Sequence, residues 1–177
     1  MCLFRVRCAV LIGLLLLFCP GQVQGQGLDT GSLAQLFVKA EEHTGVPSGL
    51  LASIAIQESS FRPWSVNLAG QGFHEDSLES AMARVRNSGV RSFDLGLMQI
   101  NVWWLKRFDV SVRQALDPAR NVVLGSLILK DCLSRYGLVG GVSCYHSGSP
   151  DGTDGRRYAR KVLRNWKMLE NGKARVR

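Results

Sequence analysis

The residue best suited to chemistry in this sequence is a single acid, Glu58. Leu51, Ile54, Ala55 and Glu58 fall at positions i, i+3, i+4 and i+7, so the carboxyl continues the apolar face of a predicted helix. Burial disfavours the ionised form and raises the pKa, which makes such a carboxyl a candidate proton donor at neutral pH. The alternative is a structural ion pair with an arginine such as Arg62, because ion pairs also perturb pKa values.

A second segment, residues 94–101, carries groups that suit a polar substrate. Gly96 allows a tight backbone approach, and the amide of Gln99 can both donate and accept hydrogen bonds. Met98 has a flexible thioether that can pack against an irregular surface, although a place in the core is its alternative. We therefore expect this segment to hold a polar substrate beside Glu58.

Apolar periodicity and turn residues predict a mainly helical chain around these segments. Ser48 and the pair Asp117-Pro118 are expected to begin helices, and the glycines at 137–141 to end one. Residues 61–93 predict an irregular lobe of the kind that often forms the wall of a cleft. The first expected helix has Asp29 or Thr30 available as its cap and runs to about residue 43. The other expected elements are a helix over 48–58, a hairpin over 66–73, helices over 77–85, 101–108 and 118–136, a short apolar segment over 142–145, and a helix from 155 to 169.

The beginning of the chain predicts export from the cytoplasm. Residues 1 to about 25 have a positive start at Arg5 and Arg7, an apolar run over 8–18 and small residues for cleavage. A membrane anchor is the alternative, but the run falls short of the roughly 20 residues that a spanning helix needs. We expect one domain at 26–177, ending in a basic helix, and no stable membrane anchor after cleavage.

The chain is basic, which indicates an anionic partner. Its formal net charge of +8 becomes +6 when the signal's two arginines are removed. Cell-wall glycan, lipid head groups and nucleic acid would all suit such a surface. Nucleic acid is not expected, because the sequence lacks zinc-type Cys/His spacing and an aromatic and basic sheet motif.

The cysteines could form a disulfide bond, and the histidines do not indicate a metal site. Cys132 and Cys144 remain after the signal and could pair, adding about 2–4 kcal/mol in an oxidising compartment; two buried free thiols are the alternative. His43, His74 and His146 are far apart and show no ligand pattern. We expect neither a metal nor a cofactor.

Three segments resemble, in order and approximate spacing, the signature motifs of the soluble lytic transglycosylase family. They are residues 55–61, 96–100 and 144–148. The third departs from the family's usual Ala-Tyr-Asn-Ala-Gly, because Cys144, His146 and Ser147 replace three of its five residues. The resemblance covers about residues 30–150. With the export signal and small size, it points to the specialised members that accompany type IV secretion, conjugation and pilus machines.

The resemblance implies a lysozyme-like α+β fold, mainly helical, with a small hairpin lobe beside a glycan cleft. It also implies a periplasmic lytic murein transglycosylase in which Glu58 is the sole catalytic acid/base. Tyr145 matches the family's tyrosine near the glutamate, and Ser59 matches a serine that could bond the carboxylate. The substrate-binding residues expected on this basis are Ser59, Gly96, Met98, Gln99 and Tyr145.

Some alternatives remain open at this stage. Asp94 is the nearest candidate for a second acid, but we interpret it as a turn or cap residue. A hydrolytic muramidase and a non-catalytic wall-binding assembly subunit are the other functions considered. The expected partners are peptidoglycan strands and subunits of a secretion, conjugation or pilus complex.

Overall fold

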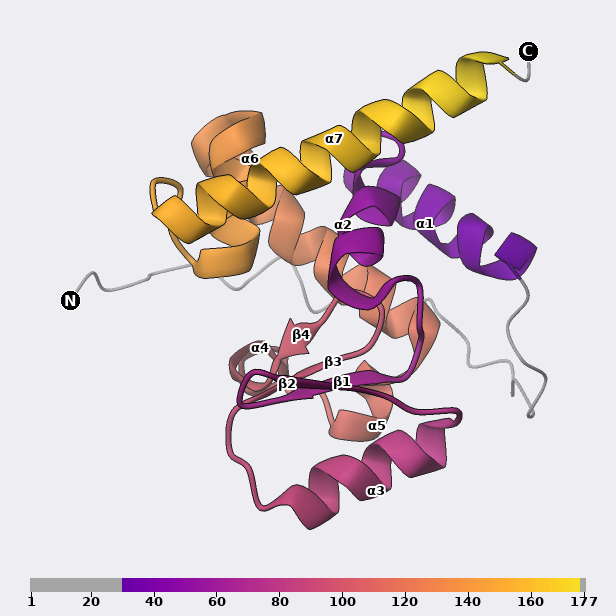
Figure 1. Cartoon of the computed structure of the whole chain (residues 1–177), viewed down its shortest axis with the longest axis vertical. Coiled ribbons are helices and arrows are strands. Elements are labelled where there is room, and N and C mark those ends of the chain that lie inside the picture. Colours follow the sequence, from indigo (N-terminus) through magenta and orange to yellow (C-terminus); the bar gives the residue numbers. More distant parts are fainter. Residues whose placement is uncertain (1–29, 176–177) are drawn as a thin grey trace.

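The computed structural model of the chain describes residues 30–175, so the expected export signal at 1–25 lies outside the described residues. Figure 1 shows the long helices on one side of the molecule and a small sheet with short helices on the other. The elements in chain order are α1 (Thr30–Thr44), α2 (Leu50–Ser59), β1 (Ser65–Leu68), β2 (Gln71–His74), α3 (Leu78–Ser88), β3 (Phe93–Leu95), β4 (Ile100–Asn101), α4 (Val102–Phe108), α5 (Val112–Ala115), α6 (Pro118–Ser147) and α7 (Thr153–Arg175).

Helix α2, which carries Glu58, begins differently from the prediction. Its N-cap is Gly49, with a φ of 82° and no side-chain cap, so the predicted cap at Ser48 is wrong. The free amides are bound instead by Glu41 of α1, whose carboxylate accepts hydrogen bonds from Gly49 N (2.8 Å) and Leu51 N (3.0 Å). A negative group at a helix N-terminus is also favoured by the helix dipole. A buried acid on one helix therefore fixes the start of the next.

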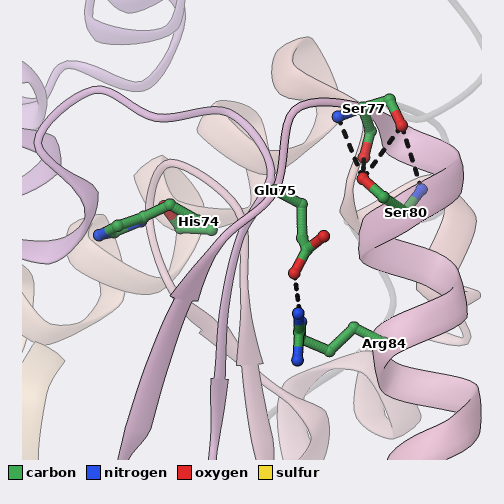
Figure 2. A network of polar contacts seen from close by, with 6 residues as sticks. His74, Glu75, Ser77, Ser80 and Arg84 are labelled. Atoms are coloured by element: carbon green, nitrogen blue, oxygen red, sulfur yellow. Dashed lines mark hydrogen bonds and ion pairs between the residues drawn. The ribbon is translucent and has the colours of Figure 1, made fainter.

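The predicted hairpin is confirmed, and it belongs to a four-stranded antiparallel sheet in the order β2-β1-β3-β4. The predicted helix over 77–85 is α3, which begins with a reciprocal capping box between Ser77 and Ser80. Figure 2 shows this cap beside the ion pair of Glu75 and Arg84, which joins the end of β2 to α3. The guanidinium of Arg84 also lies 4.2 Å from the ring centroid of Phe73. These contacts make the lobe an ordered structure.

Helix α6 begins as predicted, with the Asp117 side chain accepting from Arg120 N and Pro118 at the first position. It does not end at the glycine cluster. At Gly137 the backbone takes φ 65° and ψ −170°, which kinks the helix, and helical structure then continues to Ser147. We call the part of α6 before Gly137 its first arm and the part after Gly137 its second arm. The predicted apolar segment at 142–145 is therefore part of the second arm. A Cβ at Gly141 would lie 2.7 Å from the Leu133 backbone, so a glycine allows the two arms to pack closely.

Helix α7 packs on α6 and α2 and begins at Thr153, two residues earlier than predicted. Its inward side includes the buried Tyr158 and Val162. Side chains from both halves of the molecule join one hydrophobic cluster, which includes Phe37, Leu95 and Leu129. The mainly helical fold with a small antiparallel sheet is confirmed. Among the described residues, no helix has the length and apolar character to cross a membrane.

Candidate active site

A cavity of about 620 Å³ is lined by residues of the helices on one side and of the sheet on the other. Helix α2 contributes Glu58, α6 contributes Tyr145 and His146, and β3 contributes Asp94. The predicted substrate residue Gln99 also lines it. The rest of the lining includes Asn67, Asn101, Trp103, Trp104, Asp131, Arg135 and Tyr136.

Glu58 lies in the last turn of α2, just before the chain reverses through Ser60 and Phe61, which have φ values of 52° and 60°. Its side chain is 16% exposed. The pKa of Glu58 is raised to about 7, mainly by burial; an interaction with the Tyr158 hydroxyl opposes this rise, and the negative charge of Asp94 adds to it. A carboxyl with this pKa is present in both protonated and ionised forms near neutral pH.

The neighbours of Glu58 do not match the alternative of a structural ion pair with Arg62. Arg62 is exposed, and within the described residues no ion pair joins it to Glu58. The basic group near the carboxyl is His146, whose Nδ1 lies 4.0 Å from Glu58 Oε1. The hydroxyl of Tyr158 is buried and makes no hydrogen bond of regular geometry to a described residue. It is nevertheless near enough to Glu58 to affect the pKa of the carboxyl.

Asp94 is a strand residue, so its interpretation as a turn or cap residue is wrong. It lies in β3 between Asn67 of β1 and Asn101 of β4, and Asn101 Nδ2 donates a 2.7 Å hydrogen bond to its Oδ1. Burial raises the pKa of Asp94, while the bond from Asn101 and the charge of His146 lower it. The cavity therefore contains a second carboxyl that interacts electrostatically with Glu58.

Tyr145 lines the cavity and connects two of the resemblance segments. Its hydroxyl donates a 2.7 Å hydrogen bond to the backbone oxygen of Met98. Burial raises the pKa of Tyr145 well above its ordinary value, and the charges of Glu58 and Asp94 raise it further. The tyrosine is thus a neutral group beside the two carboxyls, and its hydroxyl holds the 96–99 loop against α6.

The expected pairing of Cys132 and Cys144 is confirmed as a disulfide, with the two Cα atoms 5.8 Å apart. Cys132 belongs to the first arm of α6 and Cys144 to the second, so the bond crosses the kink at Gly137. Both cysteines line the cavity. The bond therefore helps to fix the arm that carries Tyr145.

Comparison with known proteins agrees with this geometry. Residues 35–165 match the sequence model of the transglycosylase SLT domain. The chain belongs to the transglycosylase SLT-domain family. It is 35% identical over 144 residues to the invasion protein IagB of Salmonella typhi, covering 77% of this chain and 78% of that protein. It is also 29% identical over 113 residues to the type IV secretion system protein virB1 of Brucella abortus, covering 56% of this chain and 48% of that protein.

The 96–99 loop was expected to hold the substrate, but part of it contacts the buried side chain of Asn121 instead. Gly96 has a φ of 78°, and a Cβ there would lie 2.4 Å from Asn121 Nδ2, so its close approach is to this asparagine. Asn121 is buried; its Oδ1 accepts from Met98 N, and its Nδ2 donates to the backbone oxygens of Leu95 and Ala115. One polar side chain therefore holds the loop in shape.

Two other predicted substrate residues of this SLT domain lie behind the cavity wall. Met98 is fully buried and packs against Gly125, where a Cβ would lie 2.8 Å from the Met98 side chain. The hydroxyl of Ser59 is also buried and donates to the backbone oxygens of Ala55 (3.1 Å) and Leu97 (2.9 Å). Ser59 thus connects α2 to the loop. We had expected its hydroxyl to bond the Glu58 carboxylate, and it does not.

Gln99 lines the cavity, and two hydrogen bonds hold its side chain at the turn. It has a φ of 45°, and its Nε2 donates to the backbone oxygens of Gly96 (2.9 Å) and Ser65 (3.2 Å). Nearby, the rings of Trp103 and Trp104 meet edge to face with centroids 4.7 Å apart, and Trp103 is half exposed. Both tryptophans line the cavity, where their aromatic faces can pack on sugar rings.

Sequence reasoning missed His146 and Tyr158 as members of the site. Their rings stack, with centroids 4.2 Å apart and planes 4° from parallel. The departure from the usual third motif was a signal for His146, but Tyr158 belongs to a helix that no motif covers. Groups of three or more side chains able to hold a metal ion are absent from the part of the chain that the structure describes.

Proposed function

We propose that this SLT-domain protein is a lytic murein transglycosylase, which cleaves the β-1,4 bond between N-acetylmuramic acid and N-acetylglucosamine in peptidoglycan. The observation that carries the proposal is Glu58, a carboxyl in a cavity with a pKa of about 7. A group with this pKa can donate a proton near neutral pH and then accept one. The family resemblance assigns both roles to this residue.

The reaction needs one acid/base group and no water. The Glu58 acid donates its proton to the glycosidic oxygen as the bond from that oxygen to C1 breaks. The resulting carboxylate then takes the proton of the muramoyl C6 hydroxyl, whose oxygen forms the new bond to C1. The products are a chain ending in 1,6-anhydromuramic acid and a chain with a free hydroxyl. Glu58 is protonated again at the end, so the cycle is complete.

The surroundings of Glu58 support each step of this scheme. The transition state resembles an oxocarbenium ion, so it carries positive charge that a nearby carboxylate stabilises. Asp94 is a cavity residue whose charge affects Glu58, and it can serve this purpose without bonding to the sugar. The aromatic side chains of Trp103 and Trp104 and the amides of Asn67 and Gln99 offer the stacking and hydrogen-bonding groups that suit a glycan.

A hydrolytic muramidase is the second candidate, and the same Asp94 favours it. Ordinary glycosidases use two carboxyls, one as acid and the other as a base for water or as a nucleophile. Glu58 and Asp94 are both in the cavity and have raised pKa values. The two candidates therefore differ in which molecule attacks C1, water or the C6 hydroxyl.

For the biological role, we infer a periplasmic enzyme that opens the cell wall locally for an assembling secretion, conjugation or pilus machine. The export pattern at 1–25 supports this location, and one group of relatives is named for type IV secretion. The named relatives also include an invasion protein. A non-catalytic wall-binding subunit of such a machine is the alternative role.

The experiment that tests the proposal is digestion of purified cell-wall sacculi by the mature domain, followed by mass spectrometry of the released fragments. A transglycosylase gives anhydromuramoyl fragments, which are lighter by one water than those of a hydrolase. The matched control is Glu58→Gln, which keeps the size of the side chain and should release no fragments. Fragments carrying the extra water would favour the muramidase, and no release by the wild type, or full release by Glu58→Gln, would contradict catalysis by Glu58.

A further inference from the structure

His146 has a fixed position beside the candidate acid/base. Its Nδ1 lies 4.0 Å from Glu58 Oε1, and its ring stacks on Tyr158 with nearly parallel planes. Since Tyr158 is a buried residue of α7, this stacking holds the imidazole against that helix. His146 follows Tyr145 directly and lines the same cavity. The family's usual residue at this place is an uncharged asparagine, whereas a histidine can carry a proton.

The charges around the imidazole come from each element packed near it. The groups that act on it are Glu58 of α2, Asp94 of β3, and Asp154, Tyr158 and Lys161 of α7. Burial lowers the pKa of His146, the carboxylates of Asp154 and Asp94 raise it, and Lys161 lowers it; the net direction is downward. Because the pKa of Glu58 is about 7, there is a pH range in which the carboxyl is protonated and the imidazole is neutral.

A proton on this imidazole would oppose both halves of the reaction. Bond cleavage puts positive charge on the sugar next to the Glu58 carboxyl, and a cation 4.0 Å from that carboxyl would repel it. In the second half, an imidazolium would hold the Glu58 carboxylate in an ion pair and make it a weaker base for the C6 hydroxyl. A neutral imidazole has neither effect.

Resting on the transglycosylase function proposed above, we propose that His146 is a positioning residue that must be uncharged for Glu58 to act. Its protonation sets the acid limit of activity, while ionisation of Glu58 sets the alkaline limit. The histidine at this place thus confines lysis to a range of pH. An SLT domain with asparagine there would lack this acid limit.

The test compares the pH dependence of fragment release by the wild type and by His146→Asn, which carries the family's usual residue. One pH unit below the acid midpoint, a single essential deprotonation leaves about one tenth of the plateau rate in the wild type. His146→Asn should keep its plateau rate at that pH and should show the same alkaline limit. A purely structural role for the stacked ring would lower the rate equally at every pH.

NMR titration of the His146 ring gives a readout that does not need activity. Its pKa should equal the acid midpoint of the rate profile and should not rise in Glu58→Gln, because this variant removes a carboxyl 4.0 Å from the imidazole and adds no negative charge. In Asp94→Asn, both the His146 pKa and the acid midpoint should fall, since a carboxylate that favours the imidazolium is removed.

The possible outcomes separate the two proposals. An acid limit that persists unchanged in His146→Asn, or that differs from the His146 pKa, would overturn this inference and leave the transglycosylase intact. A wild type that releases no fragments at any pH would instead overturn the proposed function and this inference with it.

Discussion

The chemistry of Glu58 follows from where α2 ends. Helical spacing places the carboxyl next to the apolar face, and the chain then turns away at Ser60, so the side chain reaches the cavity from a mostly buried position. Burial has the largest effect on its pKa, and the opposing effects of Tyr158 and Asp94 are smaller. The acid is therefore adjusted mainly by the removal of water and only secondarily by neighbouring groups.

We expect the rate of fragment release to fall at alkaline pH. Because Glu58 must be protonated to begin the reaction and has a pKa of about 7, kcat/KM should decrease about tenfold for each pH unit above that value. Asp94→Asn should move this limit to lower pH, since the Asp94 charge raises the pKa of Glu58. Rates measured in a buffer series from acid to alkaline pH provide the check, and a rate that stays level well above neutral pH would contradict the assignment.

The same pKa predicts a pH-dependent effect of Glu58→Gln on stability. The folded-state pKa of about 7 is above the ordinary 4.5, so the stability linked to Glu58 is fully present below 4.5 and is lost as the pH rises through 7. At pH 8 the wild type should be less stable than Glu58→Gln by about 3 kcal/mol, and at pH 5 by less than about 1 kcal/mol. Thermal melts of both proteins at the two pH values test this, and an equal difference at both would refute it.

Some residues of the site could be predicted from the sequence, and others could not. Glu58 could be predicted because helical periodicity is local, and the motif around Tyr145 placed that residue correctly in the cavity lining. Ser59 and Met98 were expected at the substrate because they match family motifs, but both side chains are buried, while their neighbours Glu58 and Gln99 line the cavity. The roles of His146 and Tyr158 depend on the packing of α7 on α6, which has no local pattern.

Among the helices and strands, the second arm of α6 is an element that the sequence did not predict as helical. A group of glycines usually ends a helix, and the sequence therefore predicted an end at 137–141. In the structure only Gly137 leaves the helical region, and Gly141 allows the second arm to pack against Leu133. The Cys132–Cys144 bond then joins the two arms. Long-range packing and a covalent bond overrode the local signal.

We expect removal of this bond to destabilise the domain. The disulfide closes a short loop, with a sequence separation of 12, and a loop of this size is worth about 3 kcal/mol. Reduction should lower the melting temperature and also reduce lysis, because the freed arm carries Tyr145 and His146. Melts and fragment release with and without a reductant measure both effects.

The matched control is the double variant Cys132→Ser, Cys144→Ser. It should resemble the reduced wild type and should not respond to reductant. A wild type whose melting temperature is the same in both conditions would contradict a structural role for the bond.

At the scale of the whole molecule, the site lies where the two parts of the fold meet. The helices contribute Glu58 and Tyr145, and the sheet contributes Asp94, so the cavity requires both parts. The sequence predicted the mainly helical class, the hairpin and the order of most helices, because these follow from periodicity and turn residues. It did not predict β3 and β4, which are short strands whose pairing is defined only in three dimensions. Asp94 was misinterpreted for this reason.

In the proposed reaction the C6 hydroxyl of the substrate, and not water, attacks C1 under the control of Glu58. Digestion of sacculi in water labelled with heavy oxygen tests this most directly, because a hydrolase transfers the label to the new muramoyl end. We expect unlabelled anhydromuramoyl fragments from the wild type and no fragments from Glu58→Gln. Fragments that carry the label at the muramoyl end would show that water attacks C1 and would contradict the transglycosylase reaction.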